Sequence, residues 1–377
     1  TAILKPTFKV GDADIDNTIT KIVIDNVAKP NLGNGANGLQ FGEITIAPTS
    51  PAEDIYIHLM ALPQIYVADY EFTFTVTAGG KDYTGSLTIP TDMSIEEGKF
   101  YTATIALEEK IPYLTFTVGG EQFLVLNVMG EMDQSIEYSA DGGKWGEFEI
   151  SGDVDEYGMT TTAPVSFTNN LCMRGKSASG TVDFESSKGF MISFTENTPV
   201  TCSGDIRTLV DYTNYETTST ATACFYGLFM NCSALADASK LELISNNNEM
   251  TASCYEYMFA RCSNLTTAPA QLPATTLADN CYSNMFASCS KLISAPVLPA
   301  ETLVTNCYWH MFEDCTNLNS VTMLATNISA SNCLTNWLSG VAAGGTFTKA
   351  ASITTLPEGV SGIPSGWTVN NYEESGN

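Results

Sequence analysis

The stretch that decides the fold is CYSNMFASCSKL, residues 281–292, in which two cysteines stand eight residues apart. The same unit, Cys-(Tyr/Phe)-x-x-(Met/Leu)-Phe-x-x-Cys-(Ser/Thr)-x-Leu, begins at Cys224, Cys254 and Cys307, and a degenerate copy begins at Cys333. Successive first cysteines are 30, 27, 26 and 26 residues apart. Self-similarity at a nearly fixed period of this length indicates structural repeats that stack on one another.

Each unit has the pattern of an amphipathic helix. Cys281, Met285 and Cys289 lie at offsets 0, 4 and 8 and would form one stripe of a helix. Asn280 and Asn306, directly before the first cysteines of their units, are placed to cap helix starts. A strand-like Leu-x-x-Ala-Pro segment follows. We therefore expect one helix and one short strand per repeat, stacked as an α/β leucine-rich-repeat solenoid.

The cysteines are expected to be core residues. Nine of the 11 recur in the apolar setting of the repeats. Residues eight apart on a helix are about 12 Å apart, and neighbouring helices pack at roughly 8–10 Å, which is beyond disulfide reach for most pairs. We therefore predict nine buried free thiols. Cys172 and Cys202 stand outside the repeats, and the sequence leaves their pairing open.

The chain before the repeats is patterned as β-structure. Residues 1–109 alternate apolar and polar side chains, as in YEFTFTV at 70–76, and turn residues separate the runs. This predicts a first β-sandwich of antiparallel strands. Residues 110–198 predict a second small β-sandwich, with a hairpin between 136 and 150. The solenoid and its cap take residues 199–377, so we expect a multidomain chain with a mostly β N-terminal half.

Composition excludes several kinds of partner. The 42 acidic residues outnumber the 16 basic ones and give a net charge of -26, which repels the phosphates of nucleic acids and of anionic membranes. No apolar stretch reaches the roughly 18 residues of a membrane-spanning helix. We expect a chain without a membrane span that is monomeric in solution.

Catalytic signatures are absent from the sequence. The two histidines, His58 and His310, stand in no Ser-His-Asp or Cys-His arrangement, and no nucleotide-binding loop occurs. SADGGKW at 139–145 resembles the aspartate box of sialidase propellers, but it occurs once and Trp145 comes one residue early. A tight hairpin with Trp145 packed on the sheet is favoured. We expect no enzyme activity and no cofactor.

Two acidic runs partly match calcium-binding loops. Asp12, Asp14 and Asp16 open like a calcium loop, but Asn17 stands where the loop needs glycine and Val23 where it needs glutamate. A polar turn is the favoured interpretation there, and the same holds for the acidic pair at 153 and 155. No metal site is predicted.

The repeats carry a family resemblance. Residues 281–292, followed by APVLPA at 295–300, resemble BspA-type leucine-rich repeats of Bacteroides-like surface proteins. The segments 337–347 and 362–369 resemble the closing cap of that group. The resemblance implies an outward-facing, adhesin-like protein.

The N-terminal part carries a second resemblance. Residues 1–109 are similar to the second half of a fimbrillin-like domain, notably GKFYTATI at 98–105. Together the two resemblances imply a lipid-anchored protein of the outer membrane surface. Its anchor would come from a segment upstream of Thr1.

The favoured function is non-catalytic binding of a host protein or a glycan through the solenoid. Tyr282, Tyr308 and Trp309 are secondary candidates for this contact. Two alternatives stay open, a pilus-like subunit that polymerises by strand exchange and a glycan-binding protein for polysaccharide capture. The primary candidates are the strand-side positions expected to form an exposed ladder: Thr266, Thr267, Ile293, Ser294, Asn319 and Ser320.

Overall fold

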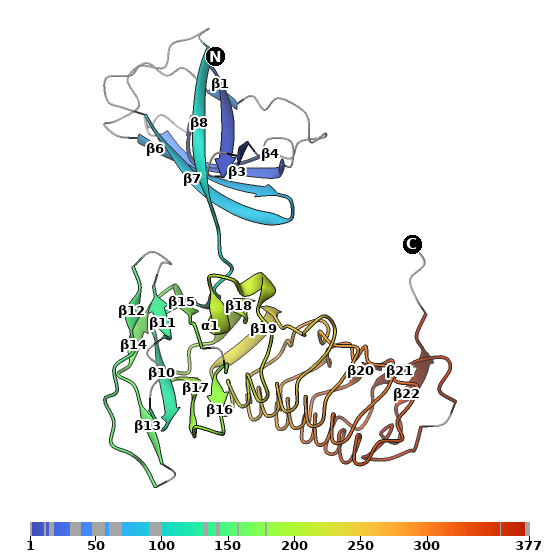
Figure 1. The fold of residues 1–377 in the computed structure, drawn as a ribbon. Helices are drawn as coiled ribbons and strands as arrows, with labels where there is room; N and C mark the ends of the chain where they lie inside the picture. Colours follow the sequence, from blue (N-terminus) through green and yellow to red (C-terminus); the bar gives the residue numbers. More distant parts are fainter. Residues whose placement is uncertain are drawn as a thin grey trace. The chain divides into compact units, whose positions relative to one another are not determined.

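The structure is a computed structural model with two compact units, residues 1–111 and 112–377, which are described separately (Figure 1). Strands make up 39% of the described residues and helices 2%, so the protein is mostly β, which agrees with the β-rich part of the predicted multidomain fold. No described helix is long and apolar enough to cross a membrane. The described residues are 2–10, 13–14, 19–30, 39–46, 57–59, 70–89, 100–131, 135–140, 144–156, 158–177, 179–354 and 356–373.

The first unit is one eight-stranded sheet in the order β2-β1-β8-β7-β6-β3-β4, with β5 paired to β1. The β6–β7 hairpin turns through Gly79 and Gly80, both at positive φ, as a tight two-residue hairpin turn requires. The β1–β8 pair is parallel, a feature that local alternation does not reveal. The strands are β1 (Ala2–Val10), β2 (Ala13–Asp14), β3 (Ile19–Pro30), β4 (Leu39–Ile46), β5 (Ile57–Leu59), β6 (Tyr70–Ala78), β7 (Lys81–Ile89) and β8 (Phe100–Glu109).

Alternation along these strands places every second side chain in one core. Phe8, Ile22, Phe74 and Ile105 are among its buried members, and the Phe8 and Phe74 rings meet edge to face at 5.7 Å. Phe8 comes from β1 and Ile105 from β8, so the parallel pair closes this core. The period-two pattern of the sequence therefore predicted the buried face correctly.

The second unit begins with two sheets that face one core. One has the order β13-β10-β17-β16 with β14 on β10, and the other has the order β12-β11-β15-β9-β18-β19. The predicted hairpin is present as β11 and β12. Helix α1 (Thr208–Asp211) and the short helix η2 (Tyr215–Thr217) lie between β18 and β19 in the chain. The strands are β9 (Leu114–Val118), β10 (Gln122–Met129), β11 (Glu137–Ser139), β12 (Gly146–Glu147), β13 (Met159–Thr161), β14 (Val165–Phe167), β15 (Asn170–Arg174), β16 (Val182–Asp183), β17 (Lys188–Phe194), β18 (Val200–Asp205) and β19 (Leu235–Glu242).

The repeats stack as parallel coils, which Figure 1 shows side by side from β19 to the C-terminal strands. Isolated parallel bridges such as Ser294 to Ser320 and Leu298 to Met323 join equivalent positions of successive repeats. The last coils form a parallel sheet of β20 (Ser320–Met323), β21 (Thr346–Lys349) and β22 (Thr368–Asn371). Each coil thus pairs with the next one by backbone hydrogen bonds.

The predicted helices are wrong, and so is the α part of the predicted solenoid. The segments 223–232, 253–262, 280–289, 306–315 and 332–340 are runs of turns, which we call turn ribbons. Within a ribbon, one N–H donates three residues back, as from Met258 to the carbonyl of Tyr255, and the next donates to the following coil, as from Phe259 to Met285. An α-helix would direct all these N–H groups four residues back.

Backbone conformation explains the difference. Every fourth ribbon residue has a positive φ, as in Asn280 (59°), Asn284 (54°) and Ser288 (61°). Asparagine is enriched in this left-handed region, and one such residue is enough to interrupt a right-handed helix. Asn280 and Asn306 (55°) are therefore turn residues and not helix caps.

The structure places no division between compact units near residue 198. The division between the two compact units lies at Ile111/Pro112, beside the predicted boundary at 109/110. Beyond it, β19 of the first repeat pairs in parallel with β18 of the sandwich. On the opposite sheet, the N–H of Ile192 in β17 donates to the carbonyl of Leu228 in the first turn ribbon at 2.7 Å. Both sheets of the sandwich thus continue into the coils, and one core runs through them.

Candidate functional site

The predicted ladder lies at the surface on one pairing line of the coils. Thr266, Thr267, Ser294 and Asn319 are exposed, and Ser320 is half-buried. Ile293 is 52% exposed, although it is a large apolar side chain and the leucine directly before it is fully buried. The ladder residues stand directly after Leu265, Leu292 and Leu318, which are fully buried and anchor each step.

Backbone pairing holds the ladder in register. The N–H of Thr266 donates to Ala236 at 2.9 Å, and the N–H of Asn319 donates to Ile293 at 3.0 Å. The Thr266 hydroxyl donates to the same Ala236 carbonyl at 2.9 Å. The ladder is therefore a surface of small polar side chains on a rigid parallel backbone.

The secondary candidates divide into buried and partly accessible residues. Tyr282 and Tyr308 are wrong as contact residues, because both are fully buried. Their rings lie 6.1 Å apart, and Tyr282 stacks on Tyr255 at 5.9 Å, within a column that continues through the coils. Trp309 remains half-buried on the ribbon face, where its ring meets that of His310 at 4.2 Å.

The nine repeat cysteines are buried thiols, as predicted, and Cys172 and Cys202 are not joined to each other. The Cys172 thiol lies 3.5 Å from the Thr115 hydroxyl. Helix spacing does not keep the repeat thiols apart, because the segments are not helices and equivalent rings of successive coils are only 5.3 to 6.1 Å apart. The thiols of Cys262 and Cys289 each donate at 3.0 Å to a phenylalanine carbonyl of the preceding coil. Burial raises the pKa of Cys232 to about 12, so this thiol stays protonated and unreactive at neutral pH.

The histidine and acidic candidates show no catalytic arrangement among the described residues. Nδ1 of His310 lies 2.7 Å from the Glu313 carboxylate, three residues away in the same ribbon. Asp155 closes a turn by accepting the N–H of Met159 at 2.8 Å. The side chains of His58 and of the acidic run at 12–16 lie outside the described residues. Among the described ones, no three His, Cys, Asp or Glu side chains gather as metal ligands would.

Trp145 lies where the hairpin interpretation expected it. Its ring meets that of Tyr113 at 4.7 Å, and the guanidinium of Arg174 sits 4.0 Å above it. Arg174 also pairs with Glu137 of β11 at 2.7 Å and stacks on Tyr212 at 4.2 Å. The aromatic faces are thus occupied by the protein's own cation.

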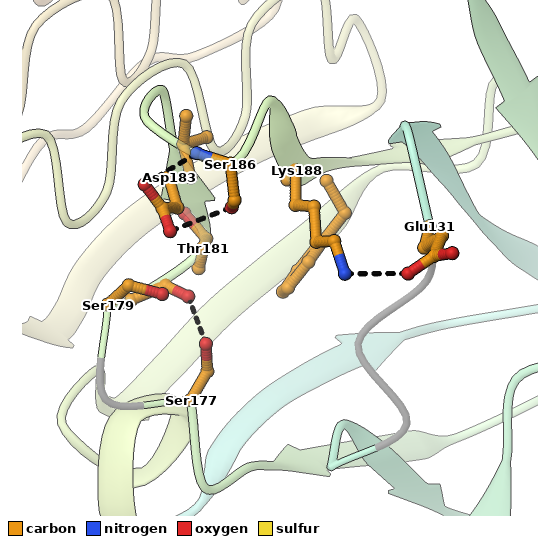
Figure 2. Close-up of a pocket in the computed structure, with 11 residues that line it drawn as sticks. Glu131, Ser177, Ser179, Thr181, Asp183, Ser186 and Lys188 are labelled. Atoms are coloured by element: carbon orange, nitrogen blue, oxygen red, sulfur yellow. Dashed lines mark hydrogen bonds and ion pairs between the residues drawn. The ribbon is translucent and has the colours of Figure 1, made fainter.

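A polar pocket of about 330 Å³ lies beside the β16–β17 hairpin, and no sequence motif indicated it (Figure 2). Several of its polar groups are already hydrogen-bonded within the protein. The Ser177 hydroxyl donates to Gly180 at 2.6 Å, and the Thr181 hydroxyl donates to Cys224 at 3.1 Å. Lys188 pairs with Glu131 at 2.6 Å. The pocket combines residues far apart in the sequence, which explains why local patterns miss it.

Hydrogen bonds keep both pocket carboxylates charged. The side chain and N–H of Ser186 donate to Asp183 and hold its pKa below the usual range. The bond from Lys188 likewise lowers the pKa of Glu131. These contacts use part of the hydrogen-bonding capacity of the charged groups. The pocket therefore offers fewer free hydrogen-bonding sites to a ligand than its composition suggests.

The ladder residues, which were predicted from the sequence, lie together at the surface on adjacent coils. The pocket was not predicted from the sequence. No family model, no curated protein and no solved structure matches this chain.

Proposed function

We propose that this chain is a non-catalytic, adhesin-like binding protein that holds a host protein or a glycan through the ladder of its repeats. The observation that carries the proposal is the recurrence of accessible hydroxyl side chains on successive coils, exposed at Thr267 and Ser294 and half-buried at Ser320, with Ser294 and Ser320 in register. A surface that repeats at a constant spacing presents many equal contacts to a partner. Such an extended surface is the usual binding device of stacked-repeat proteins.

Chemistry at the surface supports binding over catalysis. The described ladder holds hydroxyl, amide and aliphatic groups, and none of these is positioned as an acid, base or nucleophile. The buried thiols are protonated core groups, which removes the most reactive side chains of the repeats from the surface. A lipid anchor upstream of Thr1 and a place on the outer membrane surface belong to the same proposal and rest on the family resemblance.

The test is a screen of the full chain against immobilised glycans and host proteins. A variant with Thr266, Thr267 and Ser294 changed to alanine is expected to lose the binding of the positive ligands. The matched control changes Thr275, Thr276 and Thr302 to alanine, because these exposed threonines lie on another pairing line of the same coils. Binding that survives the ladder variant, or that both variants abolish equally, would overturn the assignment.

A further inference from the structure

Three ladder residues, Thr267, Ser294 and Ser320, belong to a longer row that extends along the second unit. Strand register places Thr201 opposite both Thr117 and Asp237, and Asp237 bridges to Thr267. Farther along, Ser320 bridges Ser294 and Thr346, and Thr346 pairs with Thr368. We call these residues the hydroxyl row: Thr117, Thr201, Asp237, Thr267, Ser294, Ser320, Thr346 and Thr368.

Strand pairing among the described residues links every step of the row except that from Thr267 to Ser294, and sequence equivalence links this one. Thr267 and Ser294 are equivalent residues of successive repeats, and each stands directly before an Ala-Pro step. All eight side chains are exposed or half-buried. Seven bear a hydroxyl group, and one bears a carboxylate. Neighbouring strands lie about 4.8 Å apart, so seven steps span about 34 Å.

The chemistry of the row selects among possible partners. It contains no cation, and the chain carries a charge of -26, so a polyanion is repelled. It also contains none of the Trp, Tyr, Arg or Met residues that anchor protein interfaces, and serine and threonine are under-represented among such anchors. Hydroxyl side chains both donate and accept hydrogen bonds, which suits a neutral ligand that is itself rich in hydroxyl groups.

We infer that the hydroxyl row binds a neutral linear polysaccharide that lies across the strands. The inference rests on the proposed function and names the class of ligand. Each sugar ring meets the hydroxyls of one or two coils, and the exposed Ile293 beside the row offers an apolar contact to the carbon face of a ring. Because each contact is weak, affinity comes from their number along the chain.

The length of the ligand gives the first test. The full chain is titrated with neutral oligosaccharides of two to eight sugars taken from soluble mannan, xylan and β-glucan. For at least one series, affinity is expected to rise more than a hundredfold from two sugars to eight. Affinity that is the same for short and long members of every series, or no binding to any, would overturn the inference.

Substitutions locate the contact. Thr267→Val and Thr346→Val keep the shape of the side chain and remove the hydroxyl, and each is expected to weaken binding of the eight-sugar ligand about fivefold. Thr117→Val at the far end should weaken the longest ligand and leave short ones unchanged. Thr275→Val is the matched control and should have no effect. Equal losses in all four variants would contradict the placement of the ligand on the row.

The two proposals fail in different ways. If the glycan and host-protein screen finds a protein ligand that depends on the ladder, while no neutral polysaccharide binds, the polysaccharide inference is wrong and the proposed function stands. If no ligand of either class depends on the ladder, both are wrong. Thermal unfolding of each variant, followed by tryptophan fluorescence, confirms that a loss of binding is not a loss of folding.

Discussion

The turn ribbons predict an unusual response to alanine at surface asparagines. Asn231 and Asn332 are exposed and have φ of 65° and 55°. Asparagine tolerates this left-handed region because its side-chain amide can form local hydrogen bonds. An alanine held in the same conformation costs about 1–2 kcal/mol. Asn231→Ala and Asn332→Ala should therefore each lower the free energy of unfolding of the second unit by about 1 kcal/mol. In a helix the same changes would raise it by up to about 0.7 kcal/mol, so the two structures predict opposite signs.

Urea unfolding followed by tryptophan fluorescence measures this difference cleanly, because all four tryptophans lie in the second unit. A loss of about 1 kcal/mol should move the midpoint down by roughly 0.4 M. Asn231→Gly and Asn332→Gly are the controls, since glycine adopts positive φ at no steric cost, and both should match the parent protein closely. Alanine variants that are as stable as the parent, or more so, would refute the ribbon geometry.

The packing of the coils leads to four further expected outcomes. Tyr255→Phe removes a hydroxyl that accepts from the N–H of Ile244 at 2.8 Å and donates to its carbonyl at 2.9 Å, so it should cost about 1–3 kcal/mol. Tyr282→Phe removes a buried hydroxyl without a partner in the described structure and should cost nothing; equal losses by urea unfolding would contradict this. A thiol reagent should detect all 11 cysteines in denaturant and almost none in the folded chain, and a count near zero in denaturant would refute free thiols. Burial raises the pKa of Cys224 and Cys232 from 9.0 to about 12, so their stabilisation is complete below pH 9 and is lost as the pH rises toward 12. At pH 10 each has lost about 1.4 kcal/mol, and a urea midpoint unchanged between pH 8 and pH 10 would be inconsistent with these shifts.

The sequence revealed the repeats but misled on their local structure. Buried positions at offsets 0, 4 and 8, such as Cys281, Met285 and Cys289, fit a helix of 3.6 residues per turn and also a ribbon of period four. Three positions are too few to separate the two periods. The discriminating signal lies in the polar residues, because Asn280 and Asn284 recur at an interval of four, where a helix would favour better helix formers.

Other features could not be predicted because they depend on pairing between distant segments. The change of character near residue 198 is real in the sequence, yet β18 pairs with β9 on one side and with β19 on the other. Local periodicity reports which face of a strand is buried, but it does not report the neighbouring strand. The pocket beside Lys188 is hidden for the same reason, since Glu131 reaches it from 57 residues away.

This continuity also bears on how the surface binds. A single hydroxyl contact with a solvated ligand contributes only about 1 kcal/mol net, because each partner gives up hydrogen bonds to water. Such contacts produce useful affinity only if many form at once on a surface that loses little entropy on binding. The sheet that joins Thr117 in the sandwich to Thr201 and the first coils supplies that rigidity, since strands in register cannot shift independently. A junction that flexed near residue 198 would separate the first positions of the row from the rest. The absence of a division between compact units there would let the proposed ligand use the whole face at once.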